Sequence, residues 1–179
     1  GSGELQGNPF GLDRRLASSW YEGTTGLPIL DDSIGKVLRY GYTHHNERLN
    51  VIGNFMLLSE VHPEEMYRWF SGFFVDAHDW ATVPNIYGMV RFSGSEDFAT
   101  RSCIVCSRYL LGMSDYGKGP WRDTVDGLYW RFLHRYRDSF RRDSRMKMRV
   151  SMLDRMDRQR YRRLERAALE FVERNTTTG

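Results

Sequence analysis

Two adjacent histidines, His44 and His45, are the side chains of this sequence best suited to acid–base chemistry. An imidazole has an ordinary pKa close to neutral, so a histidine can give a proton to a bound substrate. Consecutive residues of a helix point in different directions, so at most one of the two can face a given ligand squarely. Capping of a helix end, or exposure to solvent, would account for the same pair.

Two cysteines, Cys103 and Cys106, form a single CxxC motif. A structural zinc site or an iron–sulfur cluster needs about four protein ligands. The sequence holds no third cysteine and no histidine pair at zinc-finger spacing. We therefore expect no metal site and no iron–sulfur cluster, and we interpret both cysteines as small packing residues. Two thiols without a disulfide framework fit a reducing compartment, the cytoplasm, the nucleus or an organelle.

The elements that must position such residues are helices. Apolar residues recur at a helical period in the long segments, and this pattern predicts an all-α helical bundle. In the first half, helices are expected after an N-cap at Asp31 or Asp32, from about His44, and from Pro63, which suits a first turn. In the second half, three helices are expected, at 122–138, 145–153 and 157–174.

The chain is expected to hold one helical domain, residues 19–174. Residues 1–18 are interpreted as an irregular segment that begins with a Gly-Ser-Gly cloning scar, and residues 175–179 as a tail. No apolar run reaches the length of a transmembrane helix, so no membrane partner is expected.

Four stretches of the sequence carry motifs whose order and spacing are specific when they are taken together. They are WYEGTTGLPILD at 20–31, GYTHHNERL at 41–49, FVDAHDWATVPNIYGM at 74–89, and MSDY at 113–116 with LYWRF at 128–132. Together they resemble the C-terminal FAD-binding region of the photolyase/cryptochrome family, over about residues 19–165. The double histidine resembles the form found in the bacterial (6–4) branch of that family.

The resemblance implies a light-dependent flavoprotein, a DNA photolyase or a blue-light sensor, with FAD as cofactor and DNA as partner. It implies that Arg48 and Asp76 form an ion pair over the flavin ring, although a purely structural pair would satisfy a buried arginine equally well. It also implies that His44 and His45 donate a proton to the DNA lesion. The further cofactor-binding residues that it implies are Phe70, Asp79 and Asn85, although Asn85, which follows Pro84, could equally be only a turn residue.

Aromatic side chains supply two more groups of candidates. An electron-transfer relay to the flavin would use Trp20, Tyr21, Trp69 and Trp80, although aromatic residues at helical spacing are more often core. Basic residues interleaved with aromatic ones suit a flipped base and its phosphates. The DNA-binding candidates of this kind are Arg91, Arg101, Arg108, Tyr109 and Tyr116. Solvation of the surface would account for the same residues about as well.

The sequence departs from the family pattern in three respects. The electron-transfer aromatic residues are not spaced as in the family's usual tryptophan triad. The cluster cysteines of the bacterial branch are replaced at 27–30 and at 117–120. The antenna domain and the early helices that hold the flavin diphosphate in the family have no counterpart in these residues. We therefore expect the isolated chain to bind FAD weakly or not at all, and expect a missing N-terminal half or a protein partner.

Positive charge is concentrated in the last third of the chain. Between Arg131 and Arg166 there are fourteen Lys and Arg residues against five Asp and Glu residues. Such a surface suggests a polyanion partner, whereas ion pairs along the helices, such as Asp154 with Arg158, would neutralise it. The competing function is therefore a flavin-free module on the same scaffold that binds nucleic acid or takes part in an assembly.

Overall fold

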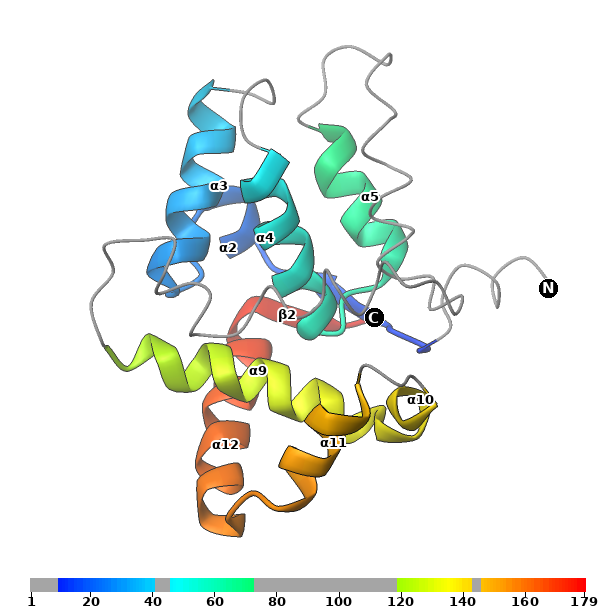
Figure 1. The fold of residues 1–179 in the computed structure, drawn as a ribbon. Helices are drawn as coiled ribbons and strands as arrows, with labels where there is room; N and C mark the ends of the chain where they lie inside the picture. Colours follow the sequence, from blue (N-terminus) through cyan, green and yellow to red (C-terminus); the bar gives the residue numbers. More distant parts are fainter. Residues whose placement is uncertain (1–9, 41–45, 73–118, 143–145) are drawn as a thin grey trace, which may run out of the picture. The chain divides into compact units, whose positions relative to one another are not determined.

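The computed structural model describes residues 10–40, 46–72, 119–142 and 146–179, with the backbone alone for residues 46–50. Within these ranges the protein is all-α apart from one small sheet, as the sequence predicts (Figure 1). None of the described helices is both long and apolar enough to cross a membrane. In chain order the elements are β1 (Arg14–Leu16), α2 (Ser19–Glu22), α3 (Pro28–Tyr40), α4 (Asn46–Leu58), α5 (Pro63–Gly72), α9 (Trp121–Arg135), α10 (Arg137–Arg141), α11 (Lys147–Asp154), α12 (Arg158–Asn175) and β2 (Thr176–Thr178).

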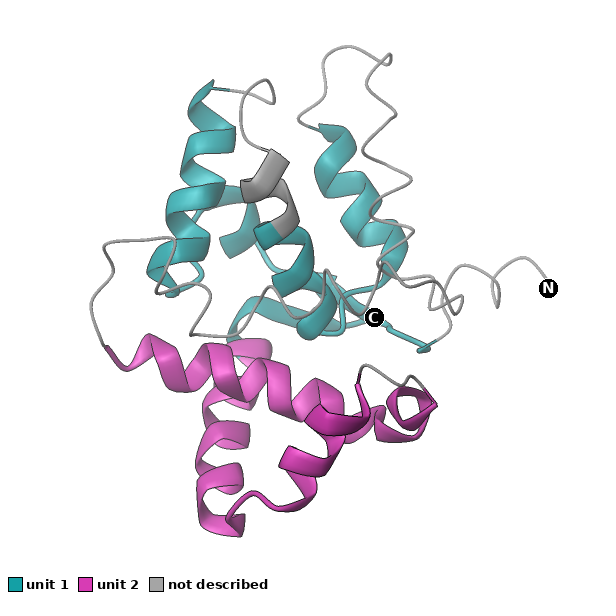
Figure 2. Cartoon of the chain, viewed as in Figure 1, with its two compact units in different colours: residues 1–93, 174–179 teal, residues 94–173 magenta. Residues whose placement is uncertain are grey.

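The chain divides into two compact units (Figure 2). The first unit comprises residues 1–93 and 174–179, and it contains α2 to α5 together with the sheet. The second unit comprises residues 94–173, and it contains α9, α10, α11 and all but the end of α12. Each unit has its own group of buried apolar side chains.

Helix α3 begins earlier than the sequence indicates, because its first residue is Pro28. A proline suits this position, since its fixed φ is helical and its missing N–H would have no partner there. The expected N-cap at Asp31 or Asp32 is therefore wrong. The Asp31 carboxylate instead accepts hydrogen bonds from Thr25 N at 2.7 Å, Thr25 Oγ1 at 2.6 Å and Gly26 N at 2.9 Å. It thereby fixes the preceding turn, in which Gly26 has a left-handed φ of 96°.

Helix α4 runs through the interior of the first unit. All described side chains between Val51 and Leu58 are buried, including the polar Asn54. Helix α3 packs against α4, and α5 adds the fully buried Trp69 to the same core. Helix α5 begins at Pro63, as the sequence predicts.

The two strands form an antiparallel pair in which Arg15 lies opposite Thr177. Neither strand is indicated by the sequence, because three residues are too few to show an alternating pattern. The strand partners come from opposite ends of the chain, so the pairing closes the first unit upon itself.

In the second unit, α9 and α12 approach each other closely at Gly127. A Cβ atom at this position would overlap the backbone carbonyl of Leu164 and lie 3.2 Å from the Cβ of Ala168. The single helix expected at 122–138 is two helices, since the helical backbone is interrupted at Tyr136, which has φ −112° and ψ 24°. The helices expected at 145–153 and 157–174 are confirmed to within two residues as α11 and α12.

Candidate functional site

Four of the residues singled out from the sequence have described side chains, namely Trp20, Tyr21, Trp69 and Phe70. Arg48 has a described backbone only, in the first turn of α4. The structure therefore tests the aromatic part of the candidate site. The remaining candidates lie outside the described residues: His44, His45, Asp76, Asp79, Trp80, Asn85, Arg91, Arg101, Cys103, Cys106, Arg108, Tyr109 and Tyr116.

Two of the relay candidates, Trp20 and Trp69, meet in the interior of the first unit. Both side chains have 0% exposure. The Trp69 indole Nε1–H donates a hydrogen bond to the backbone carbonyl of Trp20, over 3.0 Å. This bond joins α5 to α2, which are 49 residues apart, and it fixes the orientation of the Trp69 ring.

Phe70 is packed against Trp69 and is 2% exposed. The two ring centroids are 5.0 Å apart with an interplanar angle of 76°, an edge-to-face arrangement that aromatic pairs favour. Phe70 has no hydroxyl, so it contributes packing and a π system but no proton chemistry.

Tyr21 follows Trp20 in α2 and is 44% exposed, so this aromatic group reaches the surface of the unit. Partial burial raises the pKa of the Tyr21 hydroxyl, the Glu65 carboxylate raises it further, and the Arg68 guanidinium opposes both. The pKa of the Tyr21 hydroxyl therefore depends on the charges of two side chains on α5.

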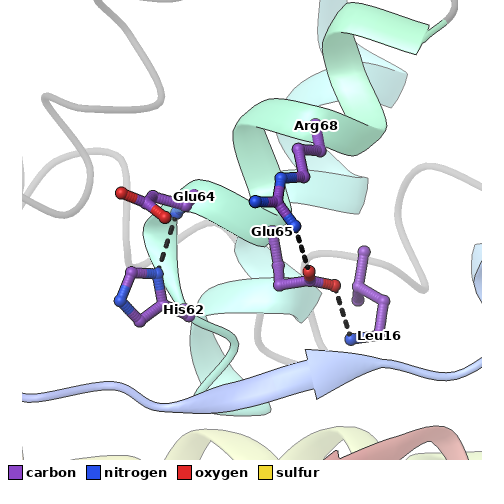
Figure 3. Close-up of polar contacts among 5 residues, drawn as sticks. All are labelled: Leu16, His62, Glu64, Glu65 and Arg68. Carbon is purple, nitrogen blue, oxygen red and sulfur yellow. Dashed lines mark hydrogen bonds and ion pairs between the residues drawn. The ribbon is translucent and has the colours of Figure 1, made fainter. Parts of the chain in front are cut away.

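The Glu65 carboxylate is held in place by two elements (Figure 3). Its Oε2 accepts a hydrogen bond from the backbone N–H of Leu16 at 3.2 Å, and its Oε1 lies 3.5 Å from Nη1 of Arg68. At the start of α5, the His62 ring nitrogen Nδ1 accepts the backbone N–H of Glu64 at 3.0 Å. This bond satisfies one of the N–H groups left free at a helix N-terminus.

Sequence reasoning missed Asn175, which is fully buried at the end of α12. Its Nδ2 donates to the carbonyl of Thr25 at 3.0 Å, and its Oδ1 accepts from Ser19 Oγ at 2.7 Å. Its backbone carbonyl accepts the indole Nε1–H of Trp20 at 2.8 Å. No local pattern marks this asparagine, because its partners lie at the opposite end of the chain.

The hydrogen bonds of this site limit which of its groups are available for chemistry. The indole N–H groups of Trp20 and Trp69 both donate to backbone carbonyls, so neither is available to a ligand. What remains for chemistry is the pair of buried π systems and the exposed Tyr21. Among the described residues there is no group of three or more His, Cys, Asp or Glu side chains that could hold a metal ion.

Comparison with known proteins gives two relatives, while no family model matches the chain. The chain is 29% identical over 152 residues to a (6-4) photolyase of Agrobacterium fabrum (strain C58 / ATCC 33970), an alignment that covers 79% of this chain and 30% of that photolyase. It is 35% identical over 106 residues to an uncharacterized protein of Acanthamoeba polyphaga mimivirus, which covers 59% of this chain and 85% of the viral protein.

These two similarities differ in what they establish. The chain spans 30% of the length of the photolyase, so the similarity is to a part of that enzyme. The viral protein is matched over most of its length and at a higher identity. The chain therefore belongs to one family with the mimivirus protein, and it is a distant relative of part of a (6-4) photolyase.

Proposed function

We propose that this chain is the C-terminal FAD-binding portion of a photolyase/cryptochrome-like flavoprotein that acts in light-dependent DNA repair or blue-light sensing. The observation that carries the proposal is the buried pair of Trp20 and Trp69, with Tyr21 beside it at the surface. Similarity to a (6-4) photolyase supports the same assignment.

FAD, when bound, supplies light absorption and electron transfer. The protein's part is then to provide a path along which an electron reaches the cofactor from the surface. Trp20 and Trp69 are excluded from water and fixed in orientation by their hydrogen bonds. The backbone carbonyl oxygens that accept these two indole N–H groups are too weakly basic to remove a proton from either tryptophan. The Tyr21 side chain is exposed, and the Glu65 carboxylate raises the pKa of its hydroxyl.

The residues proposed to hold the flavin ring include Arg48. Helix α4 is a core helix, and Arg48 lies in its first turn, where the positive end of the helix dipole disfavours a cation. A carboxylate offsets this cost, and Asp76 is the proposed partner. Asp79 and Asn85 are proposed at the ring edge, with Phe70 packing nearby.

The residues proposed to act on DNA precede α4 in the sequence, and those proposed to bind it follow α5. His44 and His45 are proposed to give a proton to the lesion, since imidazole titrates near neutral pH. Arg91, Arg101 and Arg108 are proposed to contact phosphates. The stacking partners proposed for a flipped base are Tyr109 and Tyr116.

Anaerobic illumination of the chain with FAD and an external reductant tests the relay. Loss of oxidised-flavin absorbance should be slower for Tyr21→Phe and for Trp69→Phe than for the unchanged protein. Tyr40→Phe is the matched control, since Tyr40 is 65% exposed and lies on α3. Equal rates for all four proteins, measured with equal amounts of bound FAD, would remove the support that the aromatic group gives to the proposal.

A second candidate function is a flavin-free module that binds nucleic acid or takes part in an assembly. The observation that favours it is the surface of the second unit, where eleven of the described Lys and Arg side chains between Arg135 and Arg166 are exposed. A protein that binds DNA with the same affinity whether or not FAD is added, and that shows no saturable FAD binding, would support this candidate.

A further inference from the structure

Helix α12 carries arginines at 158, 162 and 166, a group termed here the arginine stripe. Residues four apart lie on one face of a helix, about 6 Å from one another along its axis. All three arginines are exposed. Leu164 and Ala168, which are buried where α9 approaches, lie on the opposite side of α12. The arginine stripe therefore points away from the interior of its unit.

An ion pair of Asp154 with Arg158 is the neutralising alternative, and it is not the pair that Asp154 makes. Its Oδ2 lies 3.7 Å from Nη2 of Arg141, a residue at the end of α10. Asp157 is also engaged, because its Oδ2 accepts the backbone N–H of Arg160 at 3.1 Å and so caps the start of α12. The two aspartates nearest to the arginine stripe thus serve other partners.

Glu165 lies next to the last arginine of the stripe and close to Tyr161. Burial raises the pKa of Tyr161 to about 12, and the Glu165 carboxylate adds to this rise. Asp123 pairs with a different arginine of α12, with 3.6 Å between its Oδ2 and Nε of Arg163. Within the described residues, no carboxylate forms an ion pair with the arginine stripe.

We propose that the arginine stripe binds the sugar–phosphate backbone of DNA. A guanidinium is permanently charged, and its planar fork can form two parallel hydrogen bonds with a phosphate. Three such groups in a row present repeated positive charge to a linear polyanion. The identification of the polyanion as DNA rests on the proposed function. The arginine stripe adds a DNA contact that lies apart from the flavin-site residues in the sequence.

A nucleic acid fits the stripe better than a membrane surface does. The exposed residues of α12, which is described throughout, are all polar or charged. An interfacial helix must insert apolar side chains between lipids. The apolar face of α12 is instead buried within the protein, as Leu164, Ala168 and Phe171 show. The exposed face of α12 can therefore bind only through polar and charged groups, which suits phosphates spaced along a nucleic acid.

The test is fluorescence anisotropy of a labelled DNA duplex with the full chain, without added FAD, at several salt concentrations. The stripe variant combines Arg158→Gln, Arg162→Gln and Arg166→Gln. The control variant combines Arg137→Gln, Arg142→Gln and Lys147→Gln, which removes the same charge from exposed positions of the same unit. Loss of the stripe should reduce the slope of log K against log salt by about three, one for each phosphate contact. It should also weaken binding at least about tenfold at low salt.

Three results would overturn the proposal. Equal losses for the stripe and control variants would show that net charge alone matters. Unchanged binding by the stripe variant would show that the stripe makes no contact. Binding to phosphatidylserine vesicles without binding to DNA would assign the surface to a membrane. None of these readouts depends on FAD, so a failure of flavin binding and a failure of this inference remain distinguishable.

A second variant keeps the test independent of folding. Substitution of the three stripe arginines by lysine keeps the charge and a favourable helix propensity. Because lysine lacks the fork, affinity should fall by less than in the glutamine variant while the salt dependence is retained. A lysine variant that binds as weakly as the glutamine variant, with the same reduced salt slope, would contradict a charge-based contact at these positions.

Discussion

The indole N–H of Trp69 donates a hydrogen bond to the backbone carbonyl of Trp20 over 3.0 Å, and neither ring is exposed to solvent. This bond joins α5 to α2, two helices of the first unit that lie 49 residues apart in the sequence. It also makes Trp69 a structural residue, whatever its part in electron transfer. Substitution at this position must therefore affect stability.

Trp69→Phe should lower the free energy of unfolding by about 2–5 kcal/mol, because it removes ring volume and leaves a buried carbonyl without its donor. Chemical denaturation followed by circular dichroism measures the change. Tyr21→Phe is the control, since this exposed position should change stability by no more than about 0.5 kcal/mol. A loss below about 1 kcal/mol for Trp69→Phe would show that the bond and the packing are not as described.

Asp31→Asn should destabilise the first unit by about 1–3 kcal/mol, since the carboxylate accepts three hydrogen bonds from Thr25 and Gly26. The matched control is Asp32→Asn. Asp32 pairs with Lys36 at 3.3 Å, but both side chains are substantially exposed, so its loss should cost under about 1 kcal/mol. Equal effects of the two substitutions on the denaturation midpoint would contradict a role for Asp31 in fixing the turn.

Gly127→Ala should be among the most damaging single substitutions in the second unit. A Cβ atom would overlap the backbone of α12 at Leu164, so the helices must separate, which costs about 3 kcal/mol or more. Gly35→Ala in α3 is the matched control, because nothing lies within 4 Å of the added atom there. That change should stabilise the protein by about 0.5–1 kcal/mol. Thermal unfolding of both variants decides the matter, and a neutral Gly127→Ala would refute the close approach.

The Tyr21 hydroxyl should titrate above the ordinary tyrosine pKa. The phenolate is an anion, so removal of the negative charge in Glu65→Gln should lower this pKa, and removal of the positive charge in Arg68→Gln should raise it. Since the folded-state pKa lies above the unfolded one, the contribution of Tyr21 to stability falls as pH rises through this range. NMR of labelled tyrosine, assigned with Tyr21→Phe, measures the shift. Shifts in the opposite directions would show that Glu65 and Arg68 do not face Tyr21.

Much of the helical pattern could be predicted from local sequence. Pro63 opens α5 because proline suits the first turn of a helix. The periodicity of apolar residues predicts α11 and α12 to within two residues. The break at Tyr136 could not be predicted, because neither proline nor glycine marks it.

The contacts that organise the site could not be predicted, for a different physical reason. Asn175 meets Ser19 and Thr25 only after the two ends of the chain have come together. The sequence predicts Asp31 as an N-cap because aspartate is favoured at that position. Helix α3 instead begins at Pro28, and the Asp31 carboxylate accepts hydrogen bonds from the preceding turn. The sequence identified Trp20 and Trp69 as aromatic candidates, but not the bond between them.

FAD binding by the purified chain is the decisive test of the proposed flavin site. Titration of the purified chain with FAD, followed by flavin fluorescence, should show weak but saturable binding. Arg48→Gln should abolish it, while Lys36→Gln, which removes the same charge from α3, should leave it unchanged. Saturable binding that depends on Arg48 is the result that a photolyase-like flavin site predicts. No saturable binding would favour the flavin-free candidate, and binding that Arg48→Gln leaves intact would contradict that site in this chain.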